Sequence, residues 1–285
     1  MNFIHTFFPV GNTLMTKGLL NIMTLSVLSV KKHYPNSKFI LYTNEEVAKI
    51  VKNVGIPYDI INDELLEGLV TKTFSIPKLV VYSDQTEPYI HVDLDSFIFE
   101  RMEFNGDVIA SFEEGKRPSG IFMKHEEIYI TYVEPIEEIK DKLPVNFYNN
   151  LTFDNIPNMC LFGGNDYKLI SNASKLCLEI YNNNRLFFDS DYSRAAIIEQ
   201  LFIGIAIKTL SSTKFTYLFN DSLPDISYMD SENFIVIENK SNNFDGFLHL
   251  GGYKFSYNVQ ALIKSKISDE PSGSILLNNI LSINI

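Results

Sequence analysis

The sequence predicts an α/β protein in which a mixed, mostly parallel central sheet is flanked by helices. In the first hundred residues, short apolar segments alternate with segments of helical periodicity, which is the order that βαβ units require. Residues 39–41 and 108–110 are apolar on both faces, as strands covered by helices on both sides must be. With 285 residues, the chain is long enough to bury a substantial core around such a sheet.

The expected elements of the amino-terminal part follow one another in strand–helix order. Pro9 and Gly11 end the first strand, Pro35 ends the first long helix, and the turn at residues 55–57 ends the second helix. Pro77 is compatible with the first turn of a further helix. The expected strands are residues 3–8, 38–42, 58–61 and 89–92, and the expected helices are residues 14–34, 44–53, 64–70 and 76–83.

The rest of the chain begins irregularly and then returns to alternating strands and helices. Residues 113–150 carry charge clusters and scattered prolines, so we expect an excursion rather than an independent domain. The expected strands beyond it are residues 156–164, 234–237 and 246–250, with helices at residues 166–182 and 194–209 and a helical tail at the end.

Composition and charge argue against several classes of protein. The net charge of −11 at pH 7 disfavours a broad nucleic-acid surface or general binding to anionic membranes. The two cysteines, Cys160 and Cys177, lack the spacing of a metal site. Residues 1–5 have no basic n-region, and the longest apolar stretch, residues 19–30, is too short and polar to span a bilayer. We therefore expect a cytoplasmic protein without a transmembrane segment.

Two acids at the end of the fourth expected strand are the most informative feature. Asp93 and Asp95 follow the apolar residues 89–92 and precede a second apolar run at residues 97–99. Alternate side chains of a strand share a face, so we expect both carboxylates on one side, at the edge where α/β sheets bind ligands. Carboxylates this close repel each other unless a cation lies between them, and such hard ligands suit Mn²⁺ or Mg²⁺. A second acidic triplet, residues 189–191, precedes a helical pattern and is interpreted as structural.

Two segments that end strands combine glycines with polar side chains. Residues 249–254 join a histidine that could ligate a metal, a glycine turn and a lysine that could neutralise phosphate, or they form a plain strand-ending turn. Residues 158–166 end a strand in a glycine pair. They are either a strand–turn–helix in which Asn165 or Asp166 caps the helix, or the floor of a sugar site.

Two further sites carry isolated charges. Glu199 lies beside Gln200 in a helix that is apolar nearly all round, so its carboxylate needs an ionic or hydrogen-bonding partner or faces a cavity. Lys78, on the helix before the acidic strand, is either a surface lysine or a residue that reaches phosphate.

Taken together, these segments resemble a GT-A type nucleotide-sugar glycosyltransferase. The sequence is most similar to bacterial nucleotide-diphospho-sugar transferases and more distantly to glycosyltransferase family eight, and the resemblance covers most of the chain. It implies a single GT-A domain over residues 1–285, with a nucleotide-binding half at 1–112 and an acceptor-binding half at 113–285. It further implies metal-dependent transfer of a sugar, with retention of configuration, from a nucleotide sugar such as a UDP-sugar to a carbohydrate or other hydroxyl acceptor.

The resemblance also implies a role for each matching residue. Asp93, Asp95 and His249 correspond to the ligands of Mn²⁺ or Mg²⁺, and Lys254 corresponds to a lysine that contacts the diphosphate. The spacing from His249 to Lys254 is one residue shorter than is common in family eight. Glu199 is expected to face the acceptor rather than a structural partner. The implied catalytic residues are Glu199, Gln200 and Asn158, the substrate residues are Gly163, Gly164 and Asn165, and the residues for the nucleotide and its diphosphate are Thr6, Phe7, Phe8, Tyr42, Thr43, Asn44, Lys78, Asp93, Gly252 and Lys254.

Other function classes share part of this pattern. A sugar-nucleotide pyrophosphorylase has a glycine-rich, arginine-bearing loop after its first strand, which residues 9–17 lack. A metal-dependent nuclease fits poorly with a sequence pI near 4.9. A non-catalytic sugar- or nucleotide-binding protein and a phage-type DNA-modifying glycosyltransferase stay as alternatives. A non-catalytic sugar-binding protein would keep the asparagine and glycine floor without needing Asp93, Asp95 and His249 together.

Overall fold

The strands form a mixed, mostly parallel sheet, as the sequence predicts. The computed structural model describes residues 1–10, 15–114, 129–153, 156–191, 194–219, 247–250 and 254–285. Within these ranges, seven strands form one sheet in the order β3-β2-β1-β4-β7-β6-β8, and β5 pairs with β9. The pairs β1–β2, β2–β3 and β6–β8 are parallel, whereas β6–β7 is antiparallel. The strands are β1 (Asn2–Thr6), β2 (Phe39–Tyr42), β3 (Ile60–Asn62), β4 (Tyr89–Val92), β5 (Ser96–Ile98), β6 (Val108–Glu114), β7 (Ile156–Gly164), β8 (Phe215–Tyr217) and β9 (Phe247–His249).

Local capping determines where several helices begin and end. Thr16 and Asn44 accept hydrogen bonds from the backbone of the first turns of α1 and α2, and Gly55 ends α2 in the left-handed conformation. Pro77 lies in the first turn of α3, as expected. The helices are α1 (Lys17–His33), α2 (Glu45–Val54), α3 (Ile76–Asp84), α5 (Glu134–Glu137), α6 (Val145–Asn149), α7 (Tyr167–Asn183), α8 (Arg185–Ser190), α9 (Phe202–Leu210), α11 (Tyr257–Ser268) and α12 (Gly273–Ser282).

The chain divides into two compact units that are not continuous in sequence. Unit 1 comprises Met1, Gly68–His91 and Phe104–Ser222, and unit 2 comprises Asn2–Glu67, Val92–Glu103 and Leu223–Ile285. The helical tail α11–α12 therefore belongs with the amino-terminal strands. The functional division into residues 1–112 and 113–285 stays a prediction.

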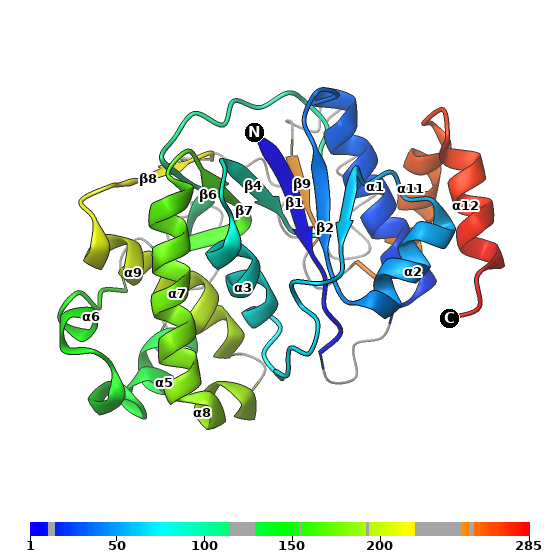
Figure 1. The fold of residues 1–285 in the computed structure, drawn as a ribbon. Helices are drawn as coiled ribbons and strands as arrows, with labels where there is room; N and C mark the ends of the chain where they lie inside the picture. Colours follow the sequence, from blue (N-terminus) through cyan, green and yellow to red (C-terminus); the bar gives the residue numbers. More distant parts are fainter. Residues whose placement is uncertain (11–14, 115–128, 154–155, 192–193, 220–246, 251–253) are drawn as a thin grey trace. The chain divides into compact units, whose positions relative to one another are not determined.

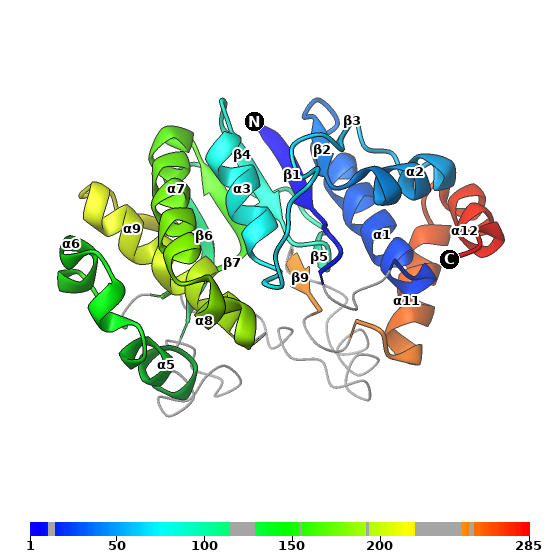
Figure 2. The ribbon, with the colours of Figure 1, turned by 60° about the horizontal axis from the view of Figure 1, so that its bottom comes forward.

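Unit 2 is built around α1. Figures 1 and 2 show α11 and α12 beside α1, and α1 also packs against β5. The residues between them form a buried apolar cluster to which Phe97 contributes from β5 and Leu250 from the residue after β9. The remaining buried members are Ile22, Leu25, Val259, Ile263 and Ile267. The segments that flank the predicted metal ligands are thus anchored in a hydrophobic core.

Unit 1 is built around α7, which packs against α3 and α9 (Figure 2). Part of the expected excursion, residues 129–149, forms short helical segments that join this unit. Phe147 of α6 contacts Phe202 of α9 edge to face, with ring centroids 4.9 Å apart. Residues 115–128 lie outside the described part of the chain, as does the expected strand at residues 234–237.

One expected helix is wrong. Residues 64–70 form a turn, because the side chain of Asn62 accepts hydrogen bonds from the backbone N–H groups of Glu64 and Leu65. Gly68 then adopts a left-handed φ of 72°. An asparagine that offers the backbone a competing partner favours a turn over a helix. Among the described residues, every helix is too short or too polar to span a lipid bilayer.

The glycine pair at the end of β7 has a structural reason. Gly163 has a φ of 156°, and a Cβ atom there would lie 2.0 Å from the carbonyl oxygen of Tyr89. At Gly164 a Cβ would lie 2.3 Å from the carbonyl oxygen of Asp107. Side chains cannot be accommodated at either position without moving the backbone of a neighbouring strand or loop.

We therefore expect Gly163→Ala to destabilise the protein by roughly 3 kcal/mol or more, because backbone strain and a clash with backbone add. Gly68→Ala is the matched control: its φ is also positive, but a Cβ there meets no atom within 4 Å. In Gly68→Ala, backbone strain alone should lower the free energy of unfolding by about 1–2 kcal/mol. Urea denaturation of both variants measures the difference, and equal losses of stability would contradict the packing explanation.

Candidate functional site

The two predicted acidic ligands lie in a tight turn of unit 2. β4 ends at Val92, and the backbone N–H of Ser96 donates to the carbonyl oxygen of Asp93 at 2.9 Å, which closes a turn over residues 93–96. The expectation that Asp93 and Asp95 continue a strand and share one face is therefore wrong. The chain reverses here because Ser96 begins β5, which pairs with β9. Asp93 is half-buried, and Asp95 is buried.

Asp95 forms an ion pair with Lys254. The Lys254 Nζ donates to Oδ2 of Asp95 at 2.8 Å, and the carboxylate side chain is 9% exposed whereas the lysine side chain is 33% exposed. The two residues are 159 positions apart in the chain. The carbonyl oxygen of Asp95 also accepts from the N–H of Leu250 at 3.0 Å. The fold thus brings the acidic triplet and the predicted diphosphate lysine into direct contact.

The backbone of His249 lies beside the same turn. His249 pairs with Ser96 in the antiparallel β5–β9 ladder, so it is opposite the residue that follows Asp95. The orientation of its side chain is not among the described features, and Gly252 lies outside the described residues. Within the described part of the chain, no three His, Cys, Asp or Glu side chains form a metal-binding group. The metal assignment to Asp93, Asp95 and His249 stays a prediction.

The donor set at this turn fits a hard divalent cation. Asp93 and Asp95 place two carboxylates within one turn, and Asp95 is buried with a cation already at 2.8 Å. A buried carboxylate requires such a positive charge, and Mg²⁺ or Mn²⁺ can provide it through carboxylate oxygen ligands. An ion bound to Asp95 would share its carboxylate with Lys254 or displace the lysine.

The predicted nucleotide-binding residues of β1 and β2 lie at the carboxyl-terminal edge of these two strands in unit 2. Thr6 pairs with Tyr42 in the parallel ladder, and the N–H of Phe7 donates to the carbonyl oxygen of Tyr42 at 3.0 Å. The buried hydroxyls of Thr6 and Thr43 have no hydrogen-bond partner among the described residues. Asn44 instead caps α2 by accepting from the backbone of Val47. Phe8 is half-buried at the same edge, and the roles of all these residues in binding stay predictions.

Glu199 has an ionic partner, contrary to the expectation that it lacks one, and its role towards an acceptor stays a prediction. The Lys78 Nζ donates to Oε1 of Glu199 at 2.7 Å, and the side chains are 13% and 6% exposed. Of the two possibilities that the sequence leaves open, a partner or a cavity, the structure provides the partner. Sequence spacing could not identify it, because Lys78 lies on α3, 121 positions away.

Gln200 is also held in place, by a residue that the sequence analysis missed. Tyr132 donates its hydroxyl proton to Oε1 of Gln200 at 2.5 Å. Both partners lie in π-helical turns, Tyr129–Val133 and Ile197–Leu201. Turns of this kind are rare and often occur at functional sites, which keeps Glu199 and Gln200 as candidates. Tyr132 has no distinguishing sequence signal, since it is one aromatic residue in an irregular segment.

Within the segment of residues 158–166, local contacts hold Asn158 and Asp166 in place. The side chain of Asn158 accepts from the N–H of Cys160 at 3.1 Å. Asn165 is exposed, and Asp166 caps α7 by accepting from Leu169 at 3.0 Å, which confirms the strand–turn–helix interpretation. Together with the packing reason for Gly163 and Gly164, these contacts explain the conformation of the segment, and its role in binding a sugar stays a prediction.

The second acidic triplet is structural, as predicted, but for a different reason. Asp189 belongs to the end of α8, and its carboxylate accepts from the hydroxyls of Thr73 and Tyr181 and from Arg185. Burial alone would raise the pKa of Asp189, but the hydrogen bonds from Thr73, Tyr181 and Arg185 outweigh it and hold the pKa below its usual value. The residue therefore connects the segment before α3 to α7 and α8.

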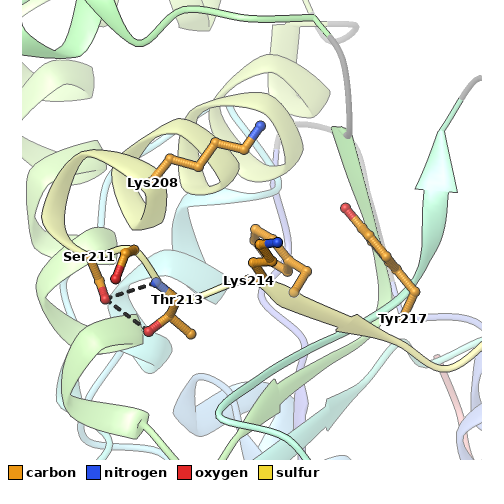
Figure 3. A pocket seen from close by; sticks show the side chains of 7 residues that line it. Lys208, Ser211, Thr213, Lys214 and Tyr217 are labelled. Atoms are coloured by element: carbon orange, nitrogen blue, oxygen red, sulfur yellow. Dashed lines mark hydrogen bonds between the residues drawn. The ribbon is translucent and has the colours of Figure 1, made fainter.

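A cavity of about 530 Å³ lies in unit 1 at the end of α9 (Figure 3). Ser211 and Thr213 at its wall bond to each other, with 2.8 Å between their hydroxyl oxygens. None of the predicted site residues lines it. The lining residues are Lys208, Ser211, Ser212, Thr213, Lys214, Phe215 and Tyr217.

Comparisons with known proteins give a family and a set of distant structures. A family model described as a family of unknown function (DUF6734) matches residues 15–272. No curated protein matches the sequence. Similar solved structures include the apo structure of the bifunctional glycosyltransferase WbbM, an active-site mutant of LgtC, and the glycosyltransferase GlyE of Streptococcus pneumoniae TIGR4.

These three structures are each 10% identical to the chain, with TM-scores of 0.46, 0.46 and 0.47 respectively. The alignments cover 99%, 94% and 99% of this chain. The chain spans about half of the WbbM structure (52%), 96% of LgtC and 63% of GlyE.

Proposed function

This chain belongs to the family of unknown function DUF6734, and we propose that it is a metal-dependent glycosyltransferase. The proposed reaction moves a sugar from a UDP-sugar to the hydroxyl of a carbohydrate or other acceptor, with retention of configuration. Its proposed metal is Mn²⁺ or Mg²⁺.

The observation that carries the proposal is the contact between Asp95 and Lys254 at the turn of residues 93–96, which we call the carboxylate turn. A glycosyltransferase that uses a nucleotide sugar must neutralise a diphosphate at one point, and it needs both a metal-binding carboxylate and a cation there. Here the two residue types come from segments 159 positions apart and lie 2.8 Å from each other. A plain surface turn does not require a buried carboxylate at this position.

Asp93 and Asp95, with His249 as a third ligand, would hold the ion. When bound, the ion would neutralise the negative charge that develops on the departing diphosphate. Lys254 would exchange its partner from Asp95 to the diphosphate, because its side chain is a third exposed and has a flexible stem. Thr6 and Thr43 would contribute hydroxyls towards the nucleoside at the edge formed by β1 and β2.

Glu199 and Gln200 are proposed to orient the acceptor in unit 1. The ion pair with Lys78 and the hydrogen bond from Tyr132 would limit the motion of both side chains, which favours positioning of a hydroxyl. A retaining transfer does not need a separate base opposite the leaving group, so it is compatible with a Glu199 carboxylate that is engaged by Lys78.

The test is isothermal titration of the protein with UDP and with uridine, each with Mn²⁺ and with chelator. We expect UDP to bind only with Mn²⁺. In Lys254→Ala, UDP binding should weaken by roughly 1.5–3 kcal/mol, because a charge-assisted hydrogen bond to the diphosphate is lost, while uridine binding should not change.

Lys17→Ala is the matched control, since its ammonium also lies in unit 2 but donates to the carbonyl oxygen of Leu281. It should bind both ligands like the wild type. Equal weakening of UDP and uridine in Lys254→Ala would remove the lysine from the diphosphate site. UDP binding that is indifferent to Mn²⁺ would favour a non-catalytic nucleotide-binding protein, and transfer or hydrolysis of a UDP-sugar would then decide between the two.

A further inference from the structure

A histidine inside the sheet of unit 2 is part of a hydrogen-bonded chain. His5 of β1 is fully buried, with Nδ1 2.6 Å from the hydroxyl of Tyr58 and Nε2 3.1 Å from Oγ of Ser26. Its ring also meets Phe39 edge to face, with 4.5 Å between centroids. Burial lowers the pKa of His5 to about 3, although the charge of Asp95 opposes the shift, so the imidazole is neutral at pH 7.

The donor and the acceptor of each hydrogen bond in this series follow from its last member, the carbonyl oxygen of Ser96. Ser26 of α1 lies 2.6 Å from the carbonyl oxygen of Ser96, and a carbonyl can only accept, so the hydroxyl proton of Ser26 points there. Ser26 Oγ must therefore accept from Nε2–H of His5. Nδ1 then carries the lone pair and accepts from the hydroxyl of Tyr58. One tautomer of His5 satisfies every contact.

This series of hydrogen bonds ends at the carboxylate turn. Ser96 is the last residue of the turn, and its N–H bonds to Asp93 while its carbonyl oxygen accepts from Ser26. Asp95, immediately before it, bonds through its own carbonyl to the N–H of Leu250. A serine in a helix commonly bonds to a carbonyl one turn earlier in the same helix, but Ser26 reaches across to β5 instead.

We propose that Ser26, oriented by His5, is a positioning residue that holds the turn of Asp93 and Asp95 in the geometry that binds the metal and the diphosphate. The inference rests on the proposed function of that turn. It also explains why the side chains of His5 and Ser26 occupy fully buried positions of β1 and α1. This relay of Tyr58, His5 and Ser26 acts through the backbone of Ser96, and none of its side chains contacts a ligand.

The experiment compares the full-length wild type with Ser26→Ala and Ser26→Thr, which keeps the hydroxyl. Amide hydrogen exchange without ligand reports on the turn through the N–H groups of Ser96 and Leu250. We expect both amides to exchange roughly tenfold faster in Ser26→Ala, because the loss of one buried hydrogen bond loosens the turn locally. The amide of Gln260 in α11, which donates to Ser256, should not change.

Titration with Mn²⁺ and UDP then reports on the consequence. Affinity should fall roughly tenfold in Ser26→Ala and recover in Ser26→Thr. Ser174→Ala is the matched control, because Ser174 is also buried in a helix and donates to a carbonyl, that of Ile170, but in unit 1. It should change neither measurement.

The two proposals can fail separately. Unchanged exchange of Ser96 and Leu250 in Ser26→Ala would overturn the relay, whatever the protein binds. Faster exchange with wild-type affinity would also overturn it, because the turn would not depend on Ser26 for binding. If the exchange changes as expected but the wild type binds no UDP with Mn²⁺, the proposed function fails and the relay stands as the device that orders the turn.

Discussion

Replacing Asp95 by Asn is expected to abolish Mn²⁺-dependent binding of UDP. The amide keeps the shape of the side chain but removes the negative charge that the proposed ion requires. Loss of a metal ligand should exceed the 10- to 100-fold effect typical of residues that only support ligands, so we expect at least about a 100-fold loss of affinity. Isothermal titration with UDP and Mn²⁺ measures it, and thermal melting checks that the variant is folded.

Asp63→Asn is the matched control for this variant. Asp63 also lies in unit 2 and pairs with a lysine, Lys52, at 3.2 Å, so the same change of charge breaks the same kind of contact. It should bind UDP and Mn²⁺ like the wild type. The metal assignment is wrong if Asp95→Asn binds as tightly as the control, or if a chelator does not affect the wild type.

Replacing Lys78 by Met is expected to lower the free energy of unfolding by about 3–5 kcal/mol. The substitution leaves the carboxylate of Glu199 buried without this cation, and breaking one side of a buried ion pair costs about that much. The double variant Lys78→Met with Glu199→Leu should recover most of the loss, because apolar side chains of similar volume can replace such a pair at little cost.

Lys49→Met is the control for loss of a lysine from an ion pair at the surface. Lys49 pairs with Glu45 at 2.6 Å, but their side chains are 68% and 66% exposed, so water screens the pair and we expect almost no loss of stability. Urea denaturation of the three variants and the wild type gives the comparison. If Lys78→Met is as stable as Lys49→Met, the contact between Lys78 and Glu199 contributes nothing to folding.

The double variant also tests whether Glu199 has a second role. If the Glu199 carboxylate contributes only to stability, the double variant should turn over a UDP-sugar like the wild type. If the stable double variant also loses turnover of a UDP-sugar while UDP still binds, Glu199 has the additional role in orienting the acceptor that the resemblance implies. The double variant is the informative one, because its fold is intact.

Much of the fold can be predicted from the sequence because it depends on local patterns. β4 and β7 begin and end at the expected residues, and α2, α3 and α7 lie within two residues of their predicted bounds. Strands buried on both faces reveal themselves as continuous apolar runs, and caps such as Asp166 reveal the first turn of a helix. The failure at residues 64–70 has a local cause too, since Asn62 bonds to the backbone in competition with a helix.

Local patterns in the sequence predict the α/β class, the position of Asp93 and Asp95 at the end of a buried strand, and a buried carboxylate at Glu199. The partners of these charges depend on contacts between distant parts of the chain. Asp95 meets Lys254, Glu199 meets Lys78, and Ser26 meets Ser96, across 159, 121 and 70 positions of the chain respectively. The physical reason is that a local pattern reports whether a side chain is buried, whereas the group that compensates its charge or hydrogen bond is brought to it by the path of the whole chain.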